Sequence, residues 1–338
     1  MPGISASLPH RRPFSAPSWL LLLAYAKLGC VSQHEPATHQ PNVATRHAPT
    51  SAASSAPPAQ TTLPGSSPAE QAALAFEPPA RLRLPSTLHN GERVPLLLVL
   101  HGFGVSSSLL IAKANLNLIA DQKMFAYLAP EGARDKLGRP FWNAGKSCCD
   151  LDHSQIDDVK RLRELLESNL GNASLDTQRV FVIGYSNGGF MAQRLACEVG
   201  AQLAGVVSVA GAAPGPDLAC AQSTALAFLE IHGDADPIVH YAGGTVFDRS
   251  DMAAHSSAPD TAQYWAKHLS CGSAPHDVSA LDLEPHVPGA ETSVQRYDGC
   301  RGSVELWTVK GGGHYVALQP PALEAIWSFV QTHPKGGG

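Results

Sequence analysis

The sequence predicts an α/β fold with a mostly parallel central sheet and helices on both faces. Short apolar runs alternate with longer amphipathic stretches, which is the pattern of strands joined by crossover helices. Of the 338 residues, 44% are hydrophobic and 16% are charged, enough apolar material for a sizeable core. No internal repeat is present, and we expect one folded domain over residues 76–334.

The elements of this domain follow from hydrophobic spacing. Apolar runs predict strands at residues 94–100, 125–129, 179–184, 205–209, 225–231 and 304–309. Helical spacing predicts helices at residues 157–170, 188–199 and 320–331. Asp157 and Asp158 stand where the first of these helices begins, so they are expected to cap its free N–H groups rather than to catalyse.

The first 75 residues differ from the rest. Arg11 and Arg12 precede an apolar run at residues 19–26 that is too short to span a bilayer, which predicts a signal within residues 1–30. Ordinary cleavage, an uncleaved anchor and lipidation of Cys30 are all open. Residues 31–75 are rich in Ser, Thr, Ala, Pro and His, which predicts a disordered tether. We expect a secreted or periplasmic protein or, if Cys30 is lipidated, a lipid-anchored envelope protein with no other membrane contact.

The cysteines suit an exported protein. Six of the seven lie beyond Cys30, and this even set predicts three disulfides. Cys271 and Cys300 flank a loop-rich excursion between two strands and are expected to pair. The sequence leaves open how the other four pair among themselves: Cys148, Cys149, Cys197 and Cys220. Metal binding is the competing reading, but the chain has no Cys-x-x-Cys pair.

A short motif between a predicted strand and a predicted helix contains a candidate nucleophile. Gly184, Ser186 and Gly188 form a G-x-S-x-G sequence directly after a β-branched run. In a nucleophile elbow a sharp turn exposes the serine, and small residues let neighbouring backbones approach. The following helix N-terminus stabilises developing negative charge. Ser186 is therefore the expected nucleophile, and a structural Gly/Ser turn is the alternative.

A serine nucleophile needs a base, and the base needs an acid that orients it. His314 follows three glycines, which allow a turn that aims the imidazole at Ser186. Asp236 follows the strand at 225–231, so the chain order is Ser, Asp, His, as in the α/β-hydrolase fold. Asp234 is the competing acid, but its Gly-Asp turn predicts a side-chain bond to the backbone two residues on. We therefore expect Asp236 to orient the histidine.

Other groups would bind the reacting ester. The backbone N–H groups of Phe103 and Asn187 are the expected donors to the oxyanion. Trp142 lies in a loop near the carboxyl edge of the sheet, where it is a candidate for substrate contact, with burial in the core as the alternative. Two further candidates for substrate contact, each beside a triad residue, are Tyr185 and Tyr315.

From about Leu96 to Val316 the chain resembles secreted polyhydroxybutyrate depolymerases and feruloyl or acetyl-xylan esterases of the α/β-hydrolase superfamily. The resemblance rests on blocks in order: Leu100-His101-Gly102, Trp142-Asn143, Cys148-Cys149, Asp157-Asp158-Val159, residues 184–191, Leu195-Ala196-Cys197, residues 232–237 with Gly243-Gly244, and residues 311–314. It implies the same serine, second acid and histidine as triad. Where the family often has a small residue and then Trp-Pro-Gly after the histidine, this chain has Tyr315, Val316 and Ala317, so a different substrate wall is expected.

Together these observations predict a serine carboxylic-ester hydrolase that requires no cofactor and no metal. Hydroxyalkanoate polyesters or their oligomers are the expected substrates, and feruloyl or acetyl esters of plant polysaccharide are the alternative. A net charge of -5 offers no basic face for nucleic acid, and we expect a monomer. The alternative function from another class is a non-catalytic surface binding protein on the same scaffold. The presence of serine, aspartate and histidine in the expected order argues against it.

Overall fold

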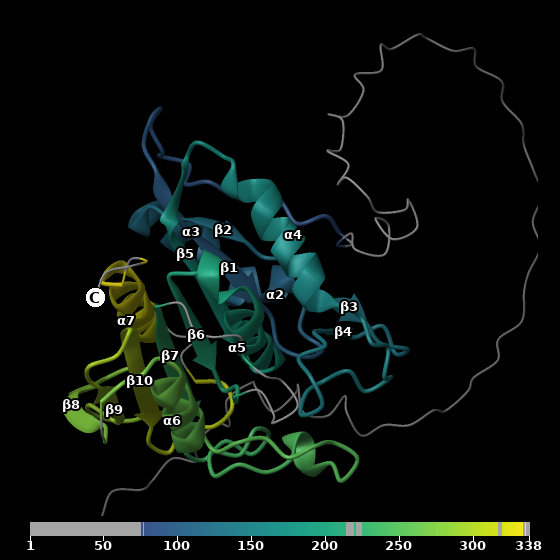
Figure 1. Ribbon diagram of the computed structural model, residues 1–338, viewed down its shortest axis with the longest axis vertical. Coiled ribbons are helices and arrows are strands. Elements are labelled where there is room, and N and C mark those ends of the chain that lie inside the picture. Colours follow the sequence, from purple (N-terminus) through teal and green to yellow (C-terminus); the bar gives the residue numbers. More distant parts are fainter. Residues whose placement is uncertain are drawn as a thin grey trace, which may run out of the picture. The chain divides into compact units, whose positions relative to one another are not determined.

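The computed structural model describes residues 76, 78–213, 220, 225–272, 274–316, 320–333 and 335 (Figure 1). They belong to one unit of the chain, residues 62–338. The expected signal and tether, residues 1–75, lie outside the described residues. Within the described part of the chain, no helix has both the length and the hydropathy needed to cross a membrane.

An eight-stranded sheet organises the described residues, in the order β2, β1, β5, β6, β7, β10, β9, β8. The strands from β2 to β10 in this order are parallel, and β9 and β8 continue the sheet antiparallel. The bounds are β1 Val94–Leu100, β2 Ala126–Leu128, β5 Leu175–Tyr185, β6 Gly205–Val209, β7 Leu226–Gly233, β8 His276–Leu281, β9 Thr292–Tyr297 and β10 Gly302–Val309. A separate short pair joins β3 (Ala133–Arg134) to β4 (Pro140–Phe141).

Helices cover both faces of the sheet, as predicted (Figure 1). Alternate residues of β1 enter two different cores: Leu96 and Leu98 one, Leu97 and Val99 the other. Helices α4 (Asp158–Leu170), α5 (Asn187–Val199) and α6 (Ala258–His268) contribute to the first core, and α2 (Ser107–Lys113), α3 (Leu116–Lys123) and α7 (Pro320–Gln331) to the second. Because β1 is buried on both sides, its sequence is apolar without a break.

The structure corrects the expected elements mainly at the periphery. The segment between Cys271 and Cys300, predicted to be loop-rich, contains β8 and β9. Strand β8 reads His-Asp-Val-Ser-Ala-Leu and has mostly exposed or partly exposed side chains, so it carries no apolar run to mark it. Helices α2, α3 and α6 were also not predicted. Asp157 caps α4 by accepting from Lys160 N–H at 3.0 Å, as expected, whereas Asp158 instead accepts from the Asn143 N–H at 2.8 Å and pairs with Arg161.

Three disulfides join cysteines of the described residues: Cys148 with Cys149, Cys197 with Cys220, and Cys271 with Cys300. The structure confirms the pair predicted from sequence, which closes the β8–β9 excursion between α6 and β10. It also resolves the pairing that the sequence left open.

Replacing both Cys271 and Cys300 by serine is expected to lower the free energy of unfolding by about 3 to 4 kcal/mol, because the bridge spans 29 positions and restricts the unfolded chain. Urea unfolding of the wild type and the double variant measures the difference. The comparison is repeated after all disulfides are reduced, where the two curves should coincide. Equal stability under oxidising conditions would contradict a stabilising bridge.

Candidate active site

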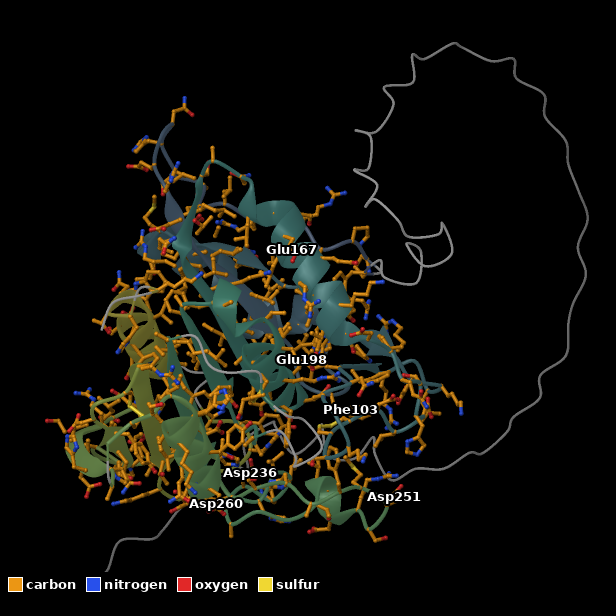
Figure 2. All side chains as sticks on the ribbon, in the orientation of Figure 1. Phe103, Glu167, Glu198, Asp236, Asp251 and Asp260 are labelled. Carbon is orange, nitrogen blue, oxygen red and sulfur yellow. A yellow bond between two sulfur atoms is a disulfide. The ribbon has the colours of Figure 1, made fainter. Side chains whose placement is uncertain are left out.

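Four parallel strands end at one edge of the sheet, and a candidate site residue follows each of them. Phe103 follows β1, Ser186 follows β5, Asp236 follows β7 and His314 follows β10. Ligands of α/β sheets bind outside the carboxyl ends of the strands, and this edge collects the four residues there. Figure 2 labels Phe103 and Asp236, both toward the lower end of the sheet in that view.

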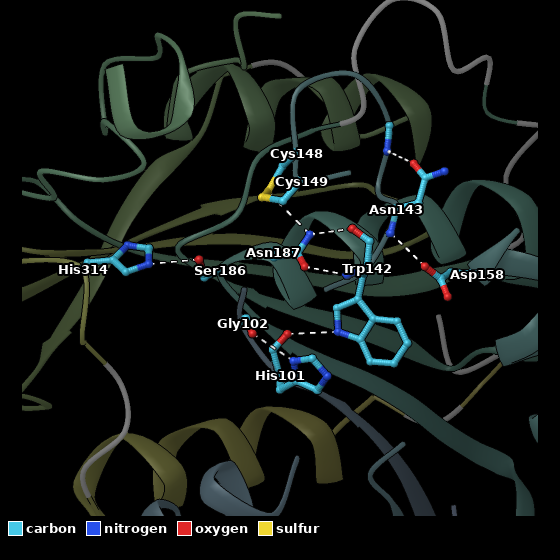
Figure 3. Close-up of a disulfide and its surroundings, with 11 residues drawn as sticks. His101, Gly102, Trp142, Asn143, Cys148, Cys149, Asp158, Ser186, Asn187 and His314 are labelled. Atoms are coloured by element: carbon cyan, nitrogen blue, oxygen red, sulfur yellow. Dashed lines mark hydrogen bonds between the residues drawn. A yellow bond between two sulfur atoms is a disulfide. The ribbon is translucent and has the colours of Figure 1, made fainter. Parts of the chain in front are cut away.

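Ser186, His314 and Asp236 form a hydrogen-bonded chain. Nε2 of His314 lies 2.9 Å from the Ser186 hydroxyl (Figure 3), and Nδ1 lies 2.7 Å from Oδ2 of Asp236. Asp236 accepts a hydrogen bond from the Nδ1–H of His314. It therefore favours the tautomer in which Nε2 carries no proton and can take the proton of Ser186. The three side chains are therefore arranged as nucleophile, base and orienting acid.

The Asp236 carboxylate is fixed in direction and in charge. Its Oδ1 accepts from the backbone N–H groups of Ile238 at 2.8 Å and Val239 at 3.0 Å. Burial opposes ionisation, but interactions with His232 and His314 outweigh it and hold the pKa of this carboxyl well below its usual range. Asp236 is therefore an anion throughout the neutral pH range.

The turn at Ser186 has the backbone of a nucleophile elbow. Ser186 has φ 54° and ψ −120°, a conformation that L residues rarely adopt, and α5 begins at the next residue. A Cβ on Gly188 would lie 2.3 Å from the Leu100 carbonyl oxygen, so only glycine lets the start of α5 pack this closely against β1. The motif residues therefore serve the close approach of β1, β5 and α5.

The expected oxyanion donors lie on two backbone segments that meet beside Ser186. A Cβ on Gly102 would lie 3.4 Å from the Ser186 Cβ, so the loop that carries Phe103 passes next to the nucleophile. Among the described residues, no group accepts a hydrogen bond from the backbone N–H of Phe103 or of Asn187. These two amides are available for a developing oxyanion.

His101 orients one of these amides. The Gly132 N–H donates to its Nε2 at 2.8 Å, so the ring proton is on Nδ1, which donates to the Gly102 carbonyl at 2.9 Å. Burial lowers the pKa of His101, which keeps the ring neutral. The Gly102 carbonyl and the Phe103 N–H belong to one planar trans peptide and point in opposite directions, so holding the carbonyl aims the N–H.

Trp142, a candidate for substrate contact from its sequence, is buried in the core and braces the other amide. Its ring has no exposed surface, so the core alternative holds. The Asn187 side chain accepts from the Trp142 N–H at 2.7 Å and donates to the Trp142 carbonyl at 2.9 Å, while the indole N–H donates to the His101 carbonyl at 3.0 Å (Figure 3). This bracing fixes the first residue of α5.

Aromatic side chains flank the triad. Tyr185 is buried, and its hydroxyl donates to the His314 carbonyl at 2.6 Å, so it positions the histidine. Burial raises the pKa of the Tyr185 hydroxyl far above its usual value and keeps the proton on the oxygen. The ring of Tyr315 stacks on that of Tyr185, with 6.3 Å between the ring centroids, and Tyr315 is 58% exposed, so its ring is accessible to substrate. Phe103 packs edge-on against Phe247, which is 46% exposed.

Asp234 bonds a different segment from the one expected. Its Oδ1 accepts from the Gly311 N–H at 2.6 Å, so it ties the loop after β7 to the glycine loop that carries His314. The expected side-chain bond to the backbone two residues on is replaced by this contact across 77 positions of sequence. Asp234 therefore supports the position of the histidine loop, while Asp236 contacts the imidazole.

Two further polar residues lie behind the triad and are not among the site residues predicted from sequence. Glu230 and His232 are fully buried side chains of β7, and His232 Nε2 lies 3.5 Å from Asp236 Oδ2. Their signal in the sequence was two titratable residues, two positions apart, near the end of an otherwise apolar strand. In the part of the chain described by the structure, no group of three or more His, Cys, Asp or Glu side chains is placed to hold a metal ion.

Two relatives by sequence are esterases by name. The protein named "Putative esterase NocK" of Nocardia uniformis subsp. tsuyamanensis is 32% identical over 232 residues, which cover 66% of this chain and 65% of NocK. Feruloyl esterase B of Piromyces equi is 29% identical over 250 residues, which cover 69% of this chain and 42% of that enzyme. The chain thus spans under two thirds of the first relative and under half of the second.

Solved structures share the fold. The acetyl xylan esterase from Aspergillus awamori matches with a TM-score of 0.52 at 16% identity, covering 73% of this chain and 93% of the enzyme. The carboxylesterase of Bacillus cereus matches with a TM-score of 0.50 at 18% identity, covering 75% of this chain and 93% of the enzyme. At these identities the likeness concerns the α/β-hydrolase fold.

The family comparison covers more than half of the chain. A family model described as Phospholipase/Carboxylesterase matches residues 89–274, a stretch that contains both Ser186 and Asp236. His314 follows that stretch and completes the triad through its contact with the Ser186 hydroxyl. This protein belongs to the phospholipase/carboxylesterase family of α/β-hydrolases.

Proposed function

We propose that this protein is a serine carboxylic-ester hydrolase. The observation that carries the proposal is the continuous chain of hydrogen bonds from Ser186 through His314 to Asp236, at 2.9 and 2.7 Å. Membership of a carboxylesterase family supports the same chemistry. No cofactor takes part in the proposed reaction.

The geometry assigns each group a step. His314 takes the Ser186 proton as the oxygen attacks the ester carbonyl, and Asp236 stabilises the imidazolium that forms. The backbone amides of Phe103 and Asn187 bind the oxyanion of the tetrahedral intermediate. His314 then protonates the leaving alcohol, and a water activated by the same imidazole releases the acyl group from Ser186.

For the substrate we propose acyl esters of polysaccharide hydroxyl groups, feruloyl or acetyl. Feruloyl esterase B among the relatives supports this class. The accessible rings of Tyr315 and Phe247 near the triad support an aromatic acyl group, because aromatic side chains stack on planar π systems. The sequence resemblance also suggests a polyhydroxyalkanoate substrate, which the substrate panel below includes.

We also propose that the protein acts outside the cytosol. Three disulfides in the described residues support an oxidising compartment, because thiols in the cytosol are kept reduced. Mass spectrometry of the protein recovered from the envelope and from the medium would show its mature N-terminus and any lipid on Cys30. Recovery of the intact chain from the cytosol alone would overturn this proposal.

A substrate panel tests the function. The purified protein is assayed on p-nitrophenyl acetate, methyl ferulate, acetylated xylan and polyhydroxybutyrate film, with Ser186→Ala as the control. We expect turnover of the soluble ester and release of ferulate or acetate. Release of hydroxybutyrate alone would reassign the substrate to the polyester. Turnover no greater than that of Ser186→Ala on every ester would favour the rival binding protein.

A further inference from the structure

Two titratable side chains are buried on one face of the central strand β7. Glu230 and His232 are 0% and 1% exposed, and because they are two positions apart in a strand they point to the same side of the sheet. Burying such groups is costly unless each has partners. Glu230 Oε2 accepts from the Gln193 amide at 3.2 Å, and Gln193 Oε1 in turn accepts from the Trp265 indole at 2.8 Å. The site is thus built into the packing of α5 and α6.

Both ring nitrogens of His232 face oxygen acceptors. Nδ1 lies 3.2 Å from Glu230 Oε1, and Nε2 lies 2.8 Å from the Val239 carbonyl and 3.5 Å from Asp236 Oδ2. Beside an ionised Glu230, a neutral imidazole, which has one N–H, would leave a lone pair pointed at one of these acceptors. The imidazolium has two N–H groups and satisfies both sides.

We propose that Glu230 and His232 form a buried ion pair that places a positive charge behind Asp236 and so sets the pH range in which His314 acts as a base. The inference rests on the proposed function, because it assigns His232 as a positioning residue for the same triad. Asp236 Oδ2 is the shared atom: it accepts from His314 at 2.7 Å on one side and faces His232 at 3.5 Å on the other.

The charges around His232 agree with this assignment. Burial disfavours its charged form, but the interactions with Asp236 and Glu230 prevail and raise the pKa of His232 to about 9. Burial raises the pKa of Glu230 and so opposes its charge, while the hydrogen bond from His232 acts in the opposite direction. The other titratable neighbours are Tyr241, whose ring packs edge-on at 5.9 Å, and His255. Burial raises the pKa of Tyr241 and lowers that of His255, so both are uncharged at neutral pH.

The pair has a definite consequence for the base. A positive charge across Asp236 disfavours a second positive charge on His314. Removing the charge on His232 stabilises the His314 imidazolium. The acid limb of the kcat/KM profile, which reports the base of the free enzyme, must then move to higher pH.

The test uses His232→Gln, whose amide nitrogen can take the place of Nε2 and keep the hydrogen bond without the charge. We expect the midpoint of the acid limb of kcat/KM on a soluble ester to move to higher pH by about one pH unit. On the plateau, kcat should stay within about threefold of wild type. His255→Gln is the matched control, because it removes a buried, uncharged histidine that packs on Phe190 and should leave the limb in place. A purely structural role of His232 would lower the thermal midpoint or the plateau and leave the limb unmoved.

A second readout does not depend on activity. In the full-length protein labelled with ¹⁵N-histidine, the His232 resonances, assigned by their loss in His232→Gln, should show two protonated ring nitrogens at pH 7. In Glu230→Gln they should titrate at lower pH. A neutral His232 at pH 7, or an unmoved acid limb in an active His232→Gln, overturns the inference. An imidazolium at His232 in a protein that hydrolyses no ester would support the ion pair and refute the proposed function instead.

Discussion

Ser186→Ala is expected to lose at least about 10⁴-fold in kcat on a soluble ester while folding as the wild type does. The substitution removes the oxygen that lies 2.9 Å from His314 Nε2 and leaves the base without a proton to take. The elbow itself persists, because Ser186 N–H still donates to the Val209 carbonyl at 2.7 Å and Gly188 still packs on β1. Residual turnover would come from the oxyanion donors and from binding alone.

Ser303→Ala is the matched control for this loss. Ser303 has the same 9% exposure as Ser186 but lies near the start of β10, at the edge of the sheet opposite the site. Both variants should show the wild-type circular dichroism spectrum, and only Ser186→Ala should lose activity. If a folded Ser186→Ala retains turnover within tenfold of the control, another group is the nucleophile.

The centre of the fold could be predicted from sequence because burial on both faces leaves a continuous apolar run. Residues 94–100, 205–209 and 320–331 coincide with β1, β6 and α7. The antiparallel edge could not be found in the same way. Strand β8 exposes most of its side chains, and its pairing with β9 depends on backbone hydrogen bonds rather than on a hydrophobic pattern.

The candidate triad was accessible from sequence because its residues follow strands in a fixed order, and a parallel sheet brings the carboxyl ends of strands together. The role of Trp142 was not accessible, because nothing in the sequence around a tryptophan that follows a short strand distinguishes a buried side chain that braces a neighbour from one that lines a substrate site. The contact of Asp234 with Gly311 was hidden for a related reason. It joins two loops that become neighbours only when β7 pairs with β10.

Asp236→Asn is expected to lower kcat by at least about 10³-fold, since the comparable change in serine proteases costs on the order of 10⁴. An asparagine can keep its oxygen toward the Ile238 and Val239 N–H groups, which turns its amide nitrogen toward Nδ1 of His314. Nδ1 must then become the acceptor, and the ring proton moves to Nε2. In that tautomer the imidazole cannot take the Ser186 proton. The negative charge that supports the imidazolium is lost as well.

Asp234→Asn is the matched comparison, with an expected loss of about tenfold or less. Among the described residues, its side chain accepts a hydrogen bond from the Gly311 N–H, and the oxygen of asparagine can accept it equally. No contact joins Asp234 to the imidazole, so the tautomer of His314 is unaffected. What remains is a small change in the stability of the histidine loop.

The two variants together identify the acid that orients the base. Both are purified, checked by circular dichroism and assayed for kcat on one soluble ester across pH 5 to 9, so that a shifted pH optimum is not taken for a lost acid. Asp236→Asn should remain severely impaired at every pH, because the wrong tautomer of the base is not repaired by changing the proton concentration. Asp234→Asn should follow the wild-type profile at a slightly lower level. The reverse ranking in two folded proteins would show that Asp234, acting through the loop that holds His314, is the acid on which catalysis depends.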